Sequence, residues 1–455
     1  MTTPQTDGAA NVPPTLRSSS LLSGFLMRAA SDGSGVVFGT IASIVTARTL
    51  GPAGKGTLAA LTFVTLLVIQ CSMLGLGDAA VVRIGQAKAS AQEALSSSLV
   101  VVGLASLAGA AVVIGYSFLQ LPMGDAGMWA AVAVACATVV VAAVGQLLIF
   151  LVYARQRTVA VSVLTIVMSM TTALGIVLLC GVLGLGVVGG TLASLGAAML
   201  GAAAALVMLM RERLTLRPHL SRSYLRPALR FGLRTQIANV LAYSSARVDL
   251  LFVYALAGQG EAGLYSVALT LGTITSFVAL ALSFASFPRM AAMSDTEALD
   301  LTAAMARTGV ILGIALAAIL AAALPTLITV LLGSDYDGAL VPGIVLLFAN
   351  VLWGEQWLLS RSLASRGDPS LLVRSFMLNL VTMAAADIVL VPVAGVLGAA
   401  LGAFIAALAG LTLCLVTYRR RGVPLRAFLP VRADLLRIRG LMTQGRRAAA
   451  AARAR

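Results

Sequence analysis

Four polar side chains within one strongly apolar segment have the chemistry to bind a charged molecule rich in hydroxyl groups. They are Gln236, Asn239, Tyr243 and Arg247, spaced by three, four and four residues. Since a helix turns by about 100° per residue, this spacing puts them on one face. The amides and the phenol would contact hydroxyls, and the guanidinium would bind phosphate through two hydrogen bonds. The stripe predicts a hydrated wall that recognises sugar and phosphate.

A related stripe begins at Arg28 and Asp32 in the first apolar segment. If the chain is an internal duplication, Arg28 aligns with Arg234, and the two arginines flank the mouth of a cavity. All three residues are therefore candidate substrate ligands. The alternatives are that both arginines extend to lipid headgroups, and that Arg247 pairs with Asp249 or Asp32 while the amides join helices.

Two acidic residues are candidates for ion coupling. Glu355 lies in an apolar segment beside Trp353 and Trp357, and Asp32 lies in the first segment. Burial favours the protonated form of a carboxyl group, so either residue could carry a proton or a cation. The alternative for Glu355 is a hydrogen-bonded packing residue.

Metal chemistry and cofactor chemistry are not expected. The chain has one histidine, His219, and four cysteines, all of which lie in apolar runs without metal-ligand spacing. Catalysis based on histidine is therefore excluded as well, and no nucleotide-binding motif is present.

The composition places these residues in a membrane. Hydrophobic residues make up 59% of the 455 residues and charged residues only 11%, whereas soluble domains carry roughly 25% charged residues. Because a span needs about 20 apolar residues, the sequence predicts about twelve transmembrane helices. Their expected ranges are 21–47, 57–76, 95–119, 128–152, 159–180, 186–210, 231–257, 264–287, 308–332, 339–360, 371–392 and 395–417.

The basic residues give the orientation. Cytoplasmic loops of membrane proteins are enriched in Lys and Arg, and of the gaps that would face outward only one holds basic residues, Arg48 and Lys55. Both termini are therefore predicted to be cytoplasmic, in a bacterial inner membrane. The connector 211–230 carries six Arg and the tail 419–455 carries eleven. Both are expected to contact anionic lipids rather than nucleic acid.

Weak self-similarity indicates a duplicated six-helix unit. The stretches that begin at Leu50 and Leu256 match at an offset of 206, and those at Gly186 and Gly395 match at 209. Since six is even, the repeats would be parallel, with a binding site at their interface. The expected fold is an all-α integral membrane protein of two six-helix bundles related by a pseudo-two-fold axis along the membrane normal. Its expected parts are a disordered N-terminus (1–20), two bundles (21–210 and 231–418), the basic connector (211–230) and the basic tail (419–455).

Three stretches resemble a known family. The run from Ala47 to Arg83, the segment from Ser223 to Ala268 and the closing stretch from Gly395 to Gly410 resemble polysaccharide-transport flippases. Their superfamily also contains multidrug and toxin extrusion antiporters and lipid II flippases. The resemblance implies two bundles around a central cavity that opens alternately to each side.

Taken together, the residues and the resemblance favour a flippase for a polyprenyl-diphosphate-linked oligosaccharide. The embedded arginines suit a diphosphate, whereas an antiporter for cationic drugs would favour carboxylates. That antiporter is the first alternative, and the second is a membrane glycosyltransferase or polymerase. The outer gaps are too short to hold an enzyme's active site, so no enzymatic activity is expected. Glycosyltransferases or a glycan polymerase are candidate partners.

Overall fold

The computed structural model describes residues 18–215, 219–364 and 370–429. Residues 1–17 of the predicted disordered N-terminus, most of the basic tail and the side chain of Arg28 lie outside the described residues, whereas residues 18–20 begin α1. The described part is helical and contains no strand. Its elements are α1 (Ser18–Ser72), α2 (Leu76–Gly85), α3 (Ala91–Gln120), α4 (Ala126–Ala154), α5 (Thr158–Ile176), the π-helix η1 (Val177–Val182), α6 (Gly186–Arg211), α7 (Arg222–Ser244), α8 (Asp249–Ala257), α9 (Gln259–Ala292), α10 (Asp295–Leu331), the 3-10 helix η2 (Ser334–Ala339), α11 (Leu340–Ala364), α12 (Ser370–Arg420) and the 3-10 helix η3 (Leu425–Phe428).

Two long helices, α1 and α12, are each interrupted by a glycine with a left-handed backbone. Gly51 in α1 has φ 65° and ψ 178° and precedes Pro52, which cannot donate to a helical ladder. The Lys55 ammonium reaches back across this turn to the Thr46 hydroxyl at 2.8 Å. Gly395 in α12 has φ 52° and ψ −131°. Because a side chain is strained at such φ values, each interruption requires glycine.

A third interruption separates α7 from α8, which meet at an angle of 49°. The span predicted over 231–257 is therefore present but broken, and its regular helix stops at Ser244 and resumes at Asp249. In the described part, nine helices are long and apolar enough to cross a membrane, and the bent pair makes a tenth. Dividing α1 at Gly51 and α12 at Gly395 gives the twelve segments that the sequence predicts. The chain is a multi-pass membrane protein.

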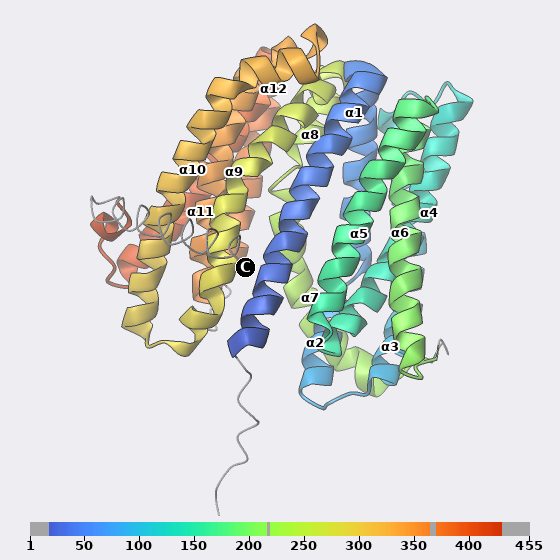
Figure 1. Ribbon diagram of the computed structural model, residues 1–455, viewed down its shortest axis with the longest axis vertical. Helices are drawn as coiled ribbons and strands as arrows, with labels where there is room; N and C mark the ends of the chain where they lie inside the picture. Colours follow the sequence, from blue (N-terminus) through green and yellow to red (C-terminus); the bar gives the residue numbers. More distant parts are fainter. Residues whose placement is uncertain (1–17, 216–218, 365–369, 430–455) are drawn as a thin grey trace, which may run out of the picture.

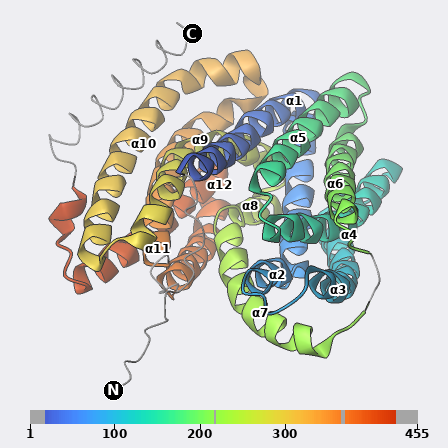
Figure 2. The same cartoon turned by 60° about the horizontal axis from the view of Figure 1, so that its bottom comes forward.

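The helices form two groups on either side of α1 (Figure 1). Helices α3 to α6 pack on one another in the first group, and α9 to α12 do so in the second. Helix α1 joins the groups because it packs against both α5 and α9. Helix α7 follows the first group in sequence but lies beside α2 beneath it, as Figures 1 and 2 both show.

The contact between the groups is reciprocal, as a two-fold axis requires. A Cβ atom added to Gly56 would lie 1.9 Å from the carbonyl oxygen of Gln259, and one added to Gly263 would lie 1.9 Å from that of Pro52. Gly263 follows Gly56 by 207 residues, and Gln259 follows Pro52 by the same number. In an isologous interface, residue i contacts j and the equivalent of j contacts the equivalent of i. The two halves therefore meet here as symmetry-related copies.

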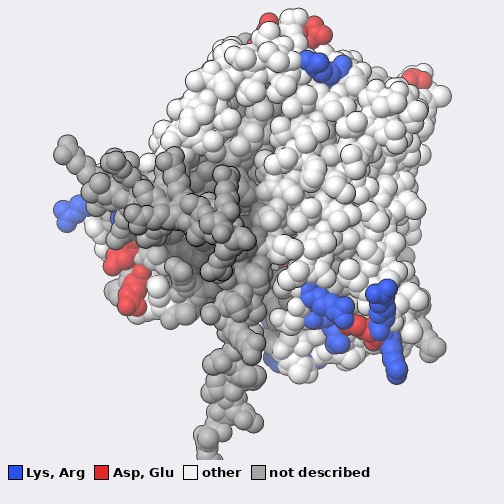
Figure 3. Space-filling view, viewed as in Figure 1, with Lys and Arg blue, Asp and Glu red and all other residues white. Residues whose placement is uncertain are grey.

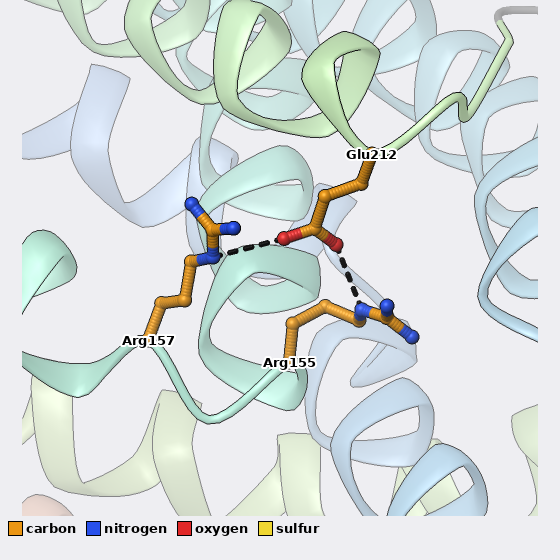
Figure 4. A network of polar contacts seen from close by, with 3 residues as sticks. All are labelled: Arg155, Arg157 and Glu212. Atoms are coloured by element: carbon orange, nitrogen blue, oxygen red, sulfur yellow. Dashed lines mark hydrogen bonds and ion pairs between the residues drawn. The ribbon is translucent and has the colours of Figure 1, made fainter.

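Charge distinguishes the two ends of the molecule. Basic side chains gather at the lower right of Figure 3, at the end that holds the α4–α5 and α6–α7 connections. We call this the basic end, and we call the end that holds Gly51 and Gly395 the opposite end. At the basic end, Glu212 binds Arg155 at 2.8 Å and Arg157 at 2.9 Å (Figure 4). These pairs tie the α4–α5 turn to the end of α6, although partly exposed pairs contribute little stability.

Candidate functional site

A cavity that borders α1 has two adjoining lobes, the larger between α1 and the second group of helices and the smaller between the first group and α9. The larger lobe, the central chamber, has a volume of about 450 Å³ and is lined by α1, α9, α11, α12 and the α7–α8 break. The smaller lobe, the side chamber, has a volume of about 210 Å³ and is lined mainly by α1, α5, α6, α7 and α9. Both linings include Gly39, Arg247, Leu269 and Thr270. The two chambers therefore meet at Arg247.

Arg247 lies where the backbone leaves the regular helix. Helix α7 ends at Ser244 and α8 begins at Asp249, and the Arg247 N–H donates to the Ser244 carbonyl at 3.1 Å. Its side chain lines both chambers and forms no hydrogen bond or close ion pair with another described side chain, although it interacts electrostatically with the Asp249 carboxylate. A cation inside a membrane-embedded cavity needs water or an anionic ligand. The site can therefore attract an anion.

The break interrupts the predicted polar stripe, so its four residues do not form one wall. Tyr243 lines the side chamber and stacks on Phe63, with ring centroids 5.7 Å apart. Gln236 and Asn239 lie outside both linings. Of the other candidates, Asp32 lines the central chamber, and the exposed Arg234 lines neither chamber.

Gln236 and Asn239 instead join α7 to the first half at the basic end. The Gln236 amide donates to the backbone carbonyl of Gln70, and the Asn239 amide donates to the Asp78 carboxylate at 3.1 Å. Helix α2, which carries Asp78, lies outside the candidate membrane spans. Burial raises the pKa of the Asp78 carboxyl above its usual value, while hydrogen bonds from Asn239 and Thr235 oppose the shift.

At the basic end, the backbones of the two halves also approach each other closely. A Cβ atom added to Gly75 would lie 2.0 Å from the carbonyl oxygen of Gly232, and one added to Gly232 would lie 2.8 Å from Gly75. The two halves therefore touch at the basic end through Gly75 and Gly232, and at the opposite end through Gly56 and Gly263. The chambers lie between these two contacts.

A pair of buried carboxylates reaches the central chamber through Asp249 alone, and the sequence did not indicate it as a site. Asp249 lines the chamber, is 1% exposed and accepts hydrogen bonds from the Tyr265 hydroxyl and the Leu250 N–H. Asp387 of α12 is 0% exposed, and neither of its oxygens has a hydrogen-bond partner among the described residues. The two carboxylates interact electrostatically. Because like charges destabilise each other in a buried site, the pair favours a bound proton or cation.

Glu355 lies behind the wall of the chambers rather than in it. It is 2% exposed, and neither carboxylate oxygen has a hydrogen-bond partner in the described part of the chain. It packs on α10, where a Cβ atom added to Gly309 would lie 2.1 Å from its Oε1. Its neighbour Gln356 accepts a hydrogen bond from Asn379, which does line the central chamber. Of the two residues predicted for ion coupling, only Asp32 borders the cavity.

The fold is similar to that of several solved membrane transporters. A lipid II flippase, MurJ, in an inward closed conformation matches with a TM-score of 0.73 and 14% identity over 89% of each chain. An outward-facing multidrug resistance MATE family transporter of the MOP superfamily matches with a TM-score of 0.65 and 14% identity, over 89% of this chain and 96% of that one. A MOP superfamily transporter from Pyrococcus furiosus gives 0.65 and 15% over the same shares. These likenesses confirm the predicted all-α fold of two bundles.

Sequence comparison adds the family. No curated protein matches the chain at a significant level. The family model described as polysaccharide biosynthesis protein matches residues 21–294, which is more than half of the chain. This range includes the stretches Ala47–Arg83 and Ser223–Ala268, which carry much of the resemblance noted in the sequence. The chain therefore belongs to the polysaccharide biosynthesis protein family.

Proposed function

We propose that the chain transfers a polyprenyl-diphosphate-linked oligosaccharide from the inner to the outer leaflet of a bacterial inner membrane. The observation that carries this proposal is Arg247, a cation that faces two chambers inside the membrane-spanning fold and forms no close ion pair with a described residue. A diphosphate cannot enter hydrocarbon without a large free-energy cost. An arginine in the path offsets that cost because its planar fork can bind two phosphate oxygens.

Transfer would proceed by alternating opening of the two ends. The contacts Gly75–Gly232 at the basic end and Gly56–Gly263 at the opposite end would separate in turn. Such rocking of two repeats about a fixed central site is the usual mechanism of transporters built from repeats. The chambers would hold the diphosphate and the first sugars, and the polyprenyl chain would stay in the lipid.

The alternative is a cation-coupled multidrug antiporter. The observation that favours it is that Asp32 and Asp249 line the same central chamber as Arg247. Purified protein in lipid vesicles distinguishes the two functions. A flippase would move a fluorescent polyprenyl-diphosphate oligosaccharide between leaflets, whereas an antiporter would move a fluorescent cationic drug into the lumen. The proposal fails if only the drug is moved.

We further propose that the basic end faces the cytoplasm, together with both termini. Single cysteines at Ala53 and Leu220, which are both exposed, test this orientation after the four native cysteines are replaced. In intact cells, a membrane-impermeant thiol reagent should label Ala53→Cys and should reach Leu220→Cys only after lysis. Labelling of Leu220→Cys in intact cells would contradict this orientation. The same side would bring the connector and the tail against anionic lipids.

Coupling to an ion gradient is proposed for the pair Asp249 and Asp387. We expect Asp387→Asn to remove the dependence of transport on a proton or sodium gradient and to slow transport by at least about tenfold, since tenfold corresponds to about 1.4 kcal/mol of lost cation binding. The measurement is transport into vesicles with and without each imposed gradient. Glu355→Gln is the comparison, because Glu355 is similarly buried and, like Asp387, lines neither chamber, but it does not interact with a second carboxylate among the described residues. If only Glu355→Gln removes the dependence, the coupling group is Glu355 and not the pair.

A further inference from the structure

The side chamber contains a second cation that the sequence assigned to an outer loop. Lys55 is only 8% exposed, and it lies four residues after the turn at Gly51. Its ammonium donates one hydrogen bond, to the Thr46 hydroxyl at 2.8 Å. An ammonium has three donors, and among the described residues Lys55 forms no ion pair with a carboxylate. The buried charge is therefore only partly satisfied.

Lys55 and Arg247 face the same enclosed space. Both line the side chamber, and they interact electrostatically. The lining contains no Asp or Glu, so it offers no carboxylate to neutralise Arg247 or a protonated Lys55, and a bound anion would stabilise the charged form of Lys55. Its polar wall also includes the hydroxyls of Thr62 and Tyr243, whereas those of Ser43, Thr46, Thr172 and Ser194 already donate hydrogen bonds within the protein.

The central chamber differs from the side chamber in the charged residues of its lining. There the same Arg247 shares the lining with Asp32 and Asp249. On the central-chamber face an anion would compete with the Asp249 carboxylate for Arg247, whereas the side-chamber face has no carboxylate in its lining and adds Lys55. Charge-assisted hydrogen bonds to phosphate are about twice as strong as neutral ones. This difference in charge between the chambers favours movement of an anionic group from the central chamber to the side chamber.

We propose that the side chamber is a second anion-binding site, in which Lys55 and Arg247 together hold the diphosphate of the substrate after it leaves the central chamber. This proposal rests on the proposed function, because it assumes a phosphate-bearing substrate. Arg247 is shared by the two positions, and Lys55 belongs only to the second. Lys55 thereby binds the substrate at a position displaced toward the opposite end, where it would be released.

Binding to purified full-length protein tests the proposal. The probes are a sugar-free polyprenyl diphosphate, the corresponding monophosphate and inorganic pyrophosphate. Lys55→Gln should weaken binding of the polyprenyl diphosphate by about tenfold, as expected for the loss of one charge-assisted hydrogen bond, and Lys55→Arg should restore most of it. The matched control is Lys88→Gln, because Lys88 is the other lysine of the chain and is exposed on the connection between α2 and α3. Pyrophosphate that competes with the lipid probe would identify the diphosphate as the recognised group, whereas equal binding of the monophosphate would overturn recognition of a diphosphate.

Chemical labelling gives a readout that does not depend on a variant. An amine-reactive reagent followed by mass spectrometry should modify Lys55 more slowly when the polyprenyl diphosphate is bound, while modification of Lys88 stays unchanged. The inference is overturned, and the proposed function survives, if the wild type binds the probe, Arg247→Ala does not, and neither Lys55→Gln nor labelling of Lys55 responds. If the wild type itself binds no polyprenyl diphosphate, the proposed function fails first.

Discussion

Replacing Arg247 by alanine should abolish glycan export while the protein still inserts into the membrane. Arg247 faces both chambers, so its loss removes the charge that offsets desolvation of the diphosphate. Two charge-assisted hydrogen bonds contribute about 3 kcal/mol, which corresponds to a reduction of about 100-fold. Arg247→Lys keeps the charge but loses the planar fork, and it should therefore retain part of the activity.

The measurement is restoration of surface glycan in cells that lack the native protein, with membrane abundance determined in parallel. Arg230→Ala is the matched control, because Arg230 is an exposed arginine on α7 that lines neither chamber. It should restore export as well as the wild type does. Normal export by an abundant Arg247→Ala protein would reduce this residue to a structural role.

Adding one methyl group at either inter-half contact should change which end of the cavity is open. In Gly263→Ala the new Cβ would lie 1.9 Å from the Pro52 carbonyl oxygen. Since a carbon–oxygen contact needs about 3.3 Å, the halves must separate by more than about 1 Å at the opposite end. Overpacking of this kind costs about 1–3 kcal/mol, which shifts a two-state equilibrium by about 5–150-fold. Gly232→Ala should act in the reverse direction, because it separates the halves at the basic end.

Accessibility of a single cysteine at Thr273, which lines the central chamber, reports this shift. A reagent applied from the opposite end should label it faster in Gly263→Ala and more slowly in Gly232→Ala than in the parent. Gly260→Ala is the control on the same helix as Gly263, because a Cβ atom there would meet no atom within 4 Å. Identical rates in all four proteins would show that these contacts do not control opening.

The membrane fold could be predicted from the sequence because its determinants are local. Each span needs only a run of apolar residues, and glycine is a signal for tight reversals such as those at Gly51 and Gly395. The duplication was visible as offsets of 206 and 209, and the contacts of Gly56 and Gly263 follow it at 207. Apolar runs, turn glycines and repeat offsets can be recognised in the sequence because none of them depends on which helices pack together.

The site was less predictable because it depends on tertiary packing. Helical spacing indicated one stripe from Gln236 to Arg247, but the break after Ser244 turns Arg247 into the chambers while Gln236 bonds to α1. A basic residue in a short gap between spans is normally predicted to be an exposed loop residue. Nothing in the sequence around Lys55 indicated that its side chain is buried. Likewise, Asp249 and Asp387 are 138 positions apart in sequence, and only the packing of α8 on α12 brings them together.

The central claim is that the chain moves a diphosphate-linked lipid through a cavity that depends on Arg247. The most direct measurement is leaflet transfer of a fluorescent polyprenyl-diphosphate oligosaccharide in vesicles that contain the purified protein. The account predicts rapid transfer by the wild type and by Arg230→Ala, partial transfer by Arg247→Lys, and only the protein-free rate for Arg247→Ala. Transfer by Arg247→Ala at the wild-type rate, or no transfer by the correctly folded wild type, would contradict it.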